Sequence, residues 1–282
     1  MRSIDLSEQK EIEINILKAV DDFCEKNGLR YYLCGGTLLG AIRHKGFIPW
    51  DDDIDIIMPR PDYERFHELF NNDNNQYRIH SVLTSPNWTS TFALIEDTRT
   101  VKIYSDFNKE STTGISLDVF PMDGSPENKF VRRLYWEFMN IIERIAILSH
   151  QKFCVSKHFS DKDVNYVGIK TVLRTGLKFL LIPLARLTIP LKLDLLINKI
   201  GSSFDVDSST FIGVVTFPHY GFKECVKGKP FLKIKKRVFE GMMFNTPDGY
   251  EEYLSNLYGD YMKMPSEEKR VSHHNVKGYW KE

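Results

Sequence analysis

The chain has 282 residues, of which 42% are hydrophobic and 13% aromatic, a composition typical of a globular protein with a substantial core. Its 38 Lys and Arg residues balance 38 Asp and Glu residues, so the formal net charge is zero. No overall positive field favours nucleic acid or an anionic membrane, and any anionic ligand must be bound by a local group of residues.

The first predicted element is an amphipathic helix over 6–26, with apolar residues at three- and four-residue intervals, closed by Asn27-Gly28. This region has no apolar signal-peptide core, so we expect a cytoplasmic protein. The four cysteines are far apart and form no CxxC pair, which indicates neither a zinc site nor a disulfide framework.

A short strand over 30–34 is predicted to lead into Gly35-Gly36. Thr37 is then expected to cap a helix over 38–44, because a threonine hydroxyl can accept hydrogen bonds from the first N–H groups of a helix. A second strand follows over 54–58 and ends at a proline.

Apolar segments between residues 76 and 120 are separated by Asn, Ser, Pro and Thr, which predicts a mixed sheet extended by antiparallel strands. Residues 129–199 are predicted to be helical, with weak breaks at Ser160-Asp161 and Pro183, and a short helix is predicted over 250–258. Together these elements indicate an α+β chain.

The segment 174–192 is apolar and flanked by basic residues. Lys178, Pro183 and Arg186 interrupt it, and its apolar part is shorter than the ~20 residues needed to span a bilayer. Two interpretations are open: a buried helix pair, or a peripheral contact with a membrane surface.

Four aspartates lie just before the predicted strand over 54–58: Asp51, Asp52, Asp53 and Asp55. In an extended chain Asp53 and Asp55 share one face about 7 Å apart, because each residue advances ~3.3 Å. Like charges so placed repel, and the arrangement becomes favourable when a divalent cation lies between them. Oxygen ligands indicate a hard ion, Mg²⁺ or else Mn²⁺.

A third carboxylate is expected from the segment 114–121, where the alternation of a strand turns Ser116 and Asp118 away from three apolar residues. Asp118 is the only carboxylate in this segment and is therefore the candidate third ligand. The alternative is that residues 51–55 form a solvated turn and Asp118 caps a neighbouring loop.

Gly35-Gly36 adds a second chemical feature, because a glycine pair before a helix lets backbone N–H groups approach an oxyanion. The helix N-terminus itself contributes about half a positive charge. Together with the aspartates, the glycine pair predicts a pocket with two walls: the glycines hold a phosphate, and the aspartates hold the metal ion that bridges it. Arg43 is the preferred cation because guanidinium binds phosphate bidentately, although a solvated side chain is the alternative.

Residues 35–41, GGTLLGA, and residues 46–55, GFIPWDDDID, resemble the LicD family of phosphocholine transferases, which is related to fukutin and fukutin-related protein. The similarity covers most of the chain and is weakest from about 129 to 210. Other segments that look like the family are LDVFPMD at 117–123 and YGDYM at 258–262, with Pro265, Lys269, Arg270 and His273.

The resemblance implies a nucleotidyltransferase-like fold of the DNA polymerase beta type. Residues 1–128 would form the catalytic core, 129–210 a helical insertion, and 211–282 a C-terminal region that completes the catalytic domain. By position, Asp53, Asp55 and Asp118 would bind the metal and act in catalysis. The donor phosphates would be bound by Gly35, Gly36, Thr37, Arg43, Lys269, Arg270 and His273.

The resemblance further implies transfer of phosphocholine, or a related phospho-alcohol, from CDP-choline or a similar CDP-alcohol to a sugar hydroxyl, with release of CMP. The hydroxyl would attack the distal phosphorus in line, with one metal ion or two, and Asp118 is the candidate base. Teichoic acid, lipopolysaccharide and other glycans are open as acceptors. A lipid-linked acceptor would suit contact of 174–192 with the inner face of a membrane.

Two other functions compete with this one. A nucleotidyltransferase of the same fold would add a nucleotide from an NTP to a small-molecule or protein hydroxyl. A binding protein without catalysis would have a broken acidic set, whereas all three carboxylates are present. For a quaternary ammonium, Trp50, Tyr31 and Tyr32 are candidate cation–π contacts, with packing in the core as the alternative.

Overall fold

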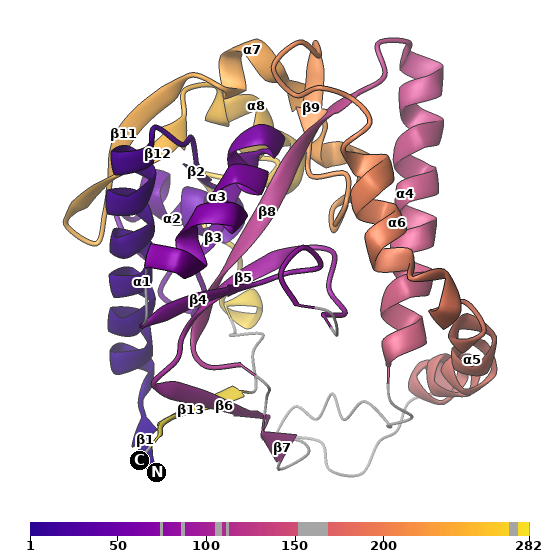
Figure 1. Ribbon diagram of the computed structural model, residues 1–282, viewed down its shortest axis with the longest axis horizontal. Coiled ribbons are helices and arrows are strands. Elements are labelled where there is room, and N and C mark those ends of the chain that lie inside the picture. Colours follow the sequence, from indigo (N-terminus) through magenta and orange to yellow (C-terminus); the bar gives the residue numbers. More distant parts are fainter. Residues whose placement is uncertain are drawn as a thin grey trace.

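The computed structural model describes residues 1–73, 76–85, 88–104, 109–110, 113–151, 169–270 and 276–281. In this part of the chain a curled mixed sheet is flanked by helices (Figure 1), which confirms the predicted α+β fold class. The domain boundaries after residues 128 and 210 stay predictions.

The main sheet has the strand order β10-β9-β8-β3-β2, and β5 joins it along β8 with β4 beyond β5. Its central pair, β3 and β8, is parallel and sets Asp55 opposite Asp118. The predicted strands between 76 and 120 are confirmed, whereas the strand expected over 30–34 is only two residues long. The bounds are β2 (Tyr32–Leu33), β3 (Asp55–Pro59), β4 (Tyr77–His80), β5 (Ala93–Asp97), β8 (Ser116–Ser125), β9 (Phe211–Gly213) and β10 (Val226–Lys227).

Helices α1 (Leu6–Asn27) and α3 (Arg60–Asp73) cover the face of the sheet that is turned to the viewer in Figure 1. The predicted N-terminal helix is confirmed: Asp5 accepts a hydrogen bond from the N–H of Glu8 (2.9 Å), and Gly28 ends the helix with φ = 63°. Because elements pack on both faces, the four apolar residues of 54–58 are all fully buried.

Helix α2 (Gly35–Arg43) begins at the first glycine and not at residue 38, so the predicted cap at Thr37 is wrong. Cys34 holds the N-cap position without a side-chain hydrogen bond. The Thr37 hydroxyl instead accepts the backbone N–H of Asp55 (2.8 Å), because β3 brings an unpaired donor beside the first turn of α2. Thr37 therefore fixes the start of the strand that carries the aspartates.

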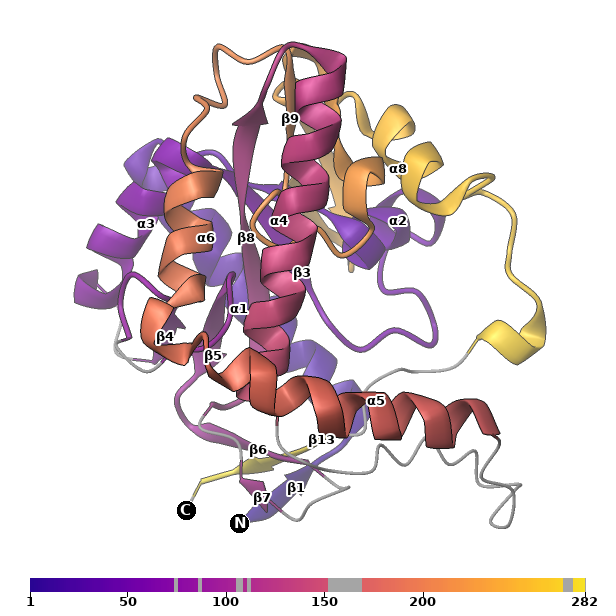
Figure 2. The same ribbon diagram turned by 90° about the vertical axis from the view of Figure 1, so that its right-hand side faces the viewer.

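Helices α4 (Lys129–His150), α5 (Ile169–Arg186) and α6 (Leu193–Gly201), with the 3₁₀ turn η1 (Ile189–Leu191), form a layer that faces the viewer in Figure 2. This layer confirms the predicted helical region 129–199 in its described parts, 129–151 and 169–199. Pro183 lies inside α5, so the break expected there is absent from this described helix, while Ser160-Asp161 lies outside the described residues. A small core of its own holds the layer together: Trp136, Met139, Ala146, Ile197 and Val215.

A buried ion pair fastens this helical layer to the sheet. Arg60 of α3 donates two hydrogen bonds to the Asp123 carboxylate of β8, each 2.7 Å long. A third N–H of Arg60 donates to the side chain of Asn198 in α6 (2.7 Å). The bidentate geometry satisfies both buried charges, so three elements that are distant in sequence are held in one arrangement.

The C-terminal third returns to the sheet and closes the fold. Helix α8 has the predicted bounds, and β13 pairs antiparallel with both β1 and β6, which brings the two ends of the chain together (Figure 1). The remaining elements are β1 (Arg2–Ile4), β6 (Thr100–Tyr104), β7 (Lys109–Glu110), η2 (Gly221–Glu224), α7 (Gly228–Phe231), β11 (Ile234–Phe239), β12 (Met242–Pro247), α8 (Tyr250–Tyr258), η3 (Glu267–Lys269) and β13 (Val276–Trp280).

Candidate active site

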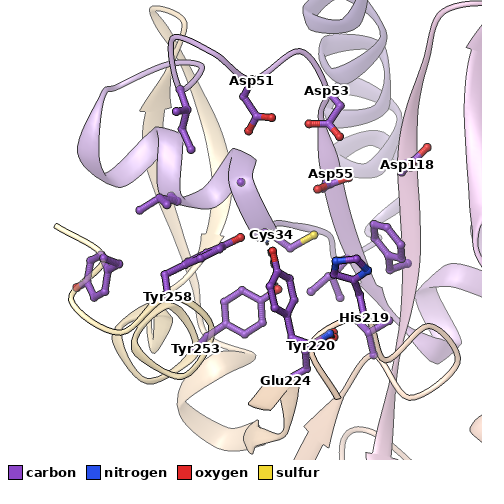
Figure 3. A pocket seen from close by; sticks show the side chains of 18 of the residues that line it. Cys34, Asp51, Asp53, Asp55, Asp118, His219, Tyr220, Glu224, Tyr253 and Tyr258 are labelled. Carbon is purple, nitrogen blue, oxygen red and sulfur yellow. Dashed lines mark hydrogen bonds between the residues drawn. The ribbon is translucent and has the colours of Figure 1, made fainter. Parts of the chain in front are cut away.

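A cavity of about 820 Å³ lies where the start of α2, the beginnings of β3 and β8, and residues 214–224 meet α8 and the chain that follows it. Aspartates lie on one side of this cavity, and a group of aromatic side chains lies on the other (Figure 3). The main sheet thus brings together residues that are more than 150 positions apart in sequence.

Asp51, Asp53, Asp55 and Asp118 line the acidic side (Figure 3). Asp55 and Asp118 are half-buried and sit at paired positions of β3 and β8. Burial, followed by the charges of Asp53 and Asp118, raises the pKa of Asp55 well above its usual value. The three predicted ligands therefore lie close enough to repel one another.

Gly35 and Gly36 also line the cavity, at the N-terminus of α2. A Cβ atom at Gly36 would lie 2.5 Å from Asp51 Oδ2, and one at Gly35 would lie 3.0 Å from Asp55 Oδ2. Gly35 also has φ = +51°, a conformation that other residues rarely adopt. Only glycine therefore lets the helix start approach both carboxylates, and the helix N-terminus favours their negative charge.

The donor atoms fit a hard divalent cation, because these side chains offer carboxylate oxygens at a wall that glycine leaves open. As they stand, however, no three His, Cys, Asp or Glu side chains in the described ranges are gathered closely enough to hold an ion.

Of the other predicted phosphate ligands, Arg43 lines the cavity, while its guanidinium donates to the backbone carbonyl of Tyr261 (2.8 Å). Thr37 is buried and holds β3, so the structure does not bring its hydroxyl to the cavity surface. Arg270 donates to the carbonyl of Pro265 (3.0 Å), a residue of the cavity wall.

Two predicted ligands cannot be placed. The side chain of Lys269 and the whole of His273 lie outside the described residues.

The backbone N–H of Gly35, a further predicted phosphate ligand, already donates to the Tyr253 hydroxyl (3.3 Å). This bond ties the start of α2 to α8.

The aromatic side of the cavity was not predicted. Its rings form a continuous run in which neighbouring ring centroids are 4.8 to 5.9 Å apart. We call this run the aromatic wall; its members are Phe92, Phe120, Phe217, His219, Tyr220 and Tyr258. The aromatic richness of the last third of the sequence was a signal, but nothing in the spacing showed which rings would converge.

The three aromatic residues considered from the sequence have different positions. Trp50 lines the cavity. Tyr31 and Tyr32 are fully buried, and their hydroxyls donate to Asp21 (2.6 Å) and to the carbonyl of Leu232 (2.6 Å). These two tyrosines therefore belong to the core.

Glu224 is an unpredicted acidic group beneath the tyrosines of the cavity (Figure 3). It is 5% exposed and accepts a hydrogen bond from the backbone N–H of Tyr220 (2.7 Å). Burial raises the pKa of Glu224 to about 8, so its carboxyl is largely protonated at neutral pH. The sequence gives no local signal for this behaviour, because it depends on the packing of η2 against α8.

Comparison with known proteins gives matches along the whole chain. A family model described as the nucleotidyltransferase domain of LicD, FKTN and FKRP matches residues 28–162. The chain is 31% identical to the lipopolysaccharide cholinephosphotransferase LicD of Haemophilus influenzae, over 99% of both chains. A shorter stretch of 32 residues, 11% of this chain and 6% of the relative, is 59% identical to the human ribitol 5-phosphate transferase FKRP.

The protonated Glu224 predicts how stability depends on pH. Below about pH 4.5 the carboxyl is protonated in both the folded and the unfolded chain, so its burial does not change the free energy of unfolding. Above that pH the unfolded chain releases the proton first, so the folded state loses stability until the pH reaches about 8. The variant Glu224→Gln avoids this loss, so we expect its stability to lie within about 1 kcal/mol of the wild type at pH 5 and to exceed it by up to about 5 kcal/mol at pH 9. Urea unfolding at both pH values measures the difference, and parallel pH profiles would contradict the burial of this carboxyl.

Proposed function

Because this chain belongs to the LicD family, we propose that it transfers phosphocholine from CDP-choline to a hydroxyl of a lipopolysaccharide-type glycan and releases CMP. Similarity to the Haemophilus influenzae cholinephosphotransferase over nearly the full length supports the transferred group and the acceptor class. The cavity carries the proposal further, because an acidic cluster, a helix N-terminus and an aromatic wall face one another within it.

We propose that Asp53, Asp55 and Asp118 hold Mg²⁺ or Mn²⁺. When bound, such an ion would polarise the phosphoryl oxygens and stabilise charge on the departing CMP. The raised pKa of Asp55 supports this assignment, because a cation would offset the repulsion and burial that now disfavour its charged form.

The residues of the chain have separate parts in the proposed transfer. The N-terminus of α2 at Gly36, with Arg43 at its other end, would bind donor phosphate oxygens. The acceptor hydroxyl would attack the distal phosphorus, a new P–O bond would form, and the bond to CMP would break. Asp118 is our candidate for accepting the proton of the hydroxyl, since it lies on the acidic side beside Asp55.

The aromatic wall suits the alcohol part of the donor. A trimethylammonium group is a cation without hydrogen-bond donors, and stacked or edge-on rings attract it by cation–π interaction. Phe217 contacts Phe92 (4.8 Å between ring centroids) and stacks with His219 (5.9 Å), so it lies in the middle of the wall. We therefore assign choline, rather than a neutral alcohol, as the group that is transferred.

The identity of the leaving group tests the reaction. We expect the protein, with Mg²⁺, CDP-choline and a lipopolysaccharide acceptor, to release CMP and to attach phosphocholine to the glycan. Mass spectrometry of the acceptor and chromatography of the nucleotide check both products. If the protein instead released pyrophosphate from CTP or ATP and attached a nucleotide, the chain would be a nucleotidyltransferase and this proposal would be wrong.

Replacement of the aspartates tests the acidic cluster. Asp53→Asn and Asp55→Asn should each lower kcat/KM by at least about 100-fold, since an ion supplies several kcal/mol of transition-state stabilisation. The metal-free variants should unfold at the same or higher urea concentration than the wild type, because a repulsion has been removed. Asp52→Asn is the matched control, since Asp52 does not line the cavity. Near-normal turnover in both cluster variants would refute the metal assignment.

A donor comparison tests the aromatic wall. Phe217→Leu keeps an apolar side chain but removes the ring, so kcat/KM for CDP-choline should fall about 2- to 30-fold, the range expected for one cation–π contact. Activity with CDP-glycerol, a donor whose alcohol carries no positive charge, should change much less. An equal fall for both donors would show that the wall binds the shared cytidine instead.

A further inference from the structure

The helical layer exposes an unusual amount of apolar surface. Of the 26 large hydrophobic residues that are exposed in the described part of the chain, 16 lie on this layer. Single exposed apolar residues are ordinary, whereas gathered ones mark a contact surface. The ten between residues 177 and 196 are Leu177, Phe179, Leu180, Leu181, Leu184, Leu187, Ile189, Leu191, Leu195 and Leu196.

Helix α5 turns its apolar stripe outward. Leu177, Leu180, Leu181 and Leu184 recur at the three- and four-residue spacing of one helix face, and they are 40 to 71% exposed. Only Ile182 and Ala185 of the described part of this helix are buried. A helix that served the protein core would have the opposite arrangement, so the outward stripe points to a partner outside the described chain.

The charge around this stripe is strongly one-sided. Between residues 169 and 200 the sequence has six Lys or Arg residues and a single acid, Asp194. Asp194 is 8% exposed and contacts His150 (3.1 Å), so it contributes little negative charge to the surface. Arg186, Lys192 and Lys199 are all exposed beside the apolar residues. The chain as a whole is neutral, which makes this face a local positive region.

We propose that α5, η1 and the exposed side of α6 form a docking face for an anionic membrane surface. The leucines would enter the boundary between headgroups and acyl chains while the basic residues contact lipid phosphates. No described helix is long and apolar enough to cross a bilayer, so the contact is peripheral. A second copy of the chain fits less well, because a symmetric contact through this face would bring like positive charges together.

This inference does not depend on the proposed phosphocholine transfer. It concerns a helical layer separate from the cavity, since none of the ten exposed apolar residues lines the site. If the transfer also holds, the docking face keeps the protein at the surface where a lipid-linked glycan is found.

Vesicle binding tests the docking face directly. The full chain should sediment with vesicles of phosphatidylcholine and phosphatidylglycerol in equal parts, should stay in solution with phosphatidylcholine alone, and should dissociate as salt is raised. Leu180→Glu/Leu184→Glu should lower the bound fraction at least about tenfold, and Lys192→Gln/Lys199→Gln should lower it at low salt. Absence of binding, or equal binding to both vesicles, would overturn the proposal.

Two controls keep this test decisive. Ile234→Glu/Met243→Glu makes the same change at exposed apolar residues of the β11–β12 hairpin, on the opposite side of the molecule from α5 in Figure 1, and should leave vesicle binding unchanged. If the glutamate variant fails to fold, Leu184→Trp gives a second readout: a blue shift of emission on anionic vesicles that the wild type, with its four native tryptophans, does not show. A wild-type dimer that Leu180→Glu/Leu184→Glu converts to a monomer without lipid would assign the face to a second copy instead.

Discussion

The parallel pairing of β3 with β8 is the constraint around which the site is built, because it holds Asp55 opposite Asp118. Neighbouring elements reinforce this pairing, although its two carboxylates repel each other. The Thr37 hydroxyl accepts a hydrogen bond from the backbone N–H of Asp55, and the N–H of Cys34 donates to the backbone carbonyl of Asp55 (3.1 Å). Backbone bonds thus fix the carboxylates in an arrangement that costs free energy without a counter-charge, which is typical of a binding site.

Much of this could be predicted because the signals are local. The helix over 6–26 combines an apolar stripe with a glycine end, and its structure follows the pattern closely. The strand over 54–58 is a short, mostly apolar run, and apolar and polar residues alternate in the segment around Asp118. Both patterns are typical of strands, so their pairing into one sheet was a reasonable expectation. The glycine and aspartate motifs resemble a family to which the full-length comparison also assigns the chain.

The features that sequence reasoning missed depend on distant contacts. Thr37 has the residue type of a helix cap, but the backbone of Asp55 competes for its hydroxyl. The aromatic wall joins Phe92 to Tyr258, and no pattern within either segment reveals the other. The pKa of Glu224 is raised because packing encloses its carboxyl, and Pro183 remains within α5 although proline usually ends a helix.

The pairing of β13 between β1 and β6 has a consequence for how the molecule is made. Residues 2–4 and 100–104 acquire their central partner strand only after residue 280 has left the ribosome. The edges of β1 and β6 that face β13 therefore stay open until residues 276–280 are made, although residues 2–4 and 100–104 are synthesised much earlier. A nascent chain paused before residue 276 presents unpaired edges that favour association with other chains.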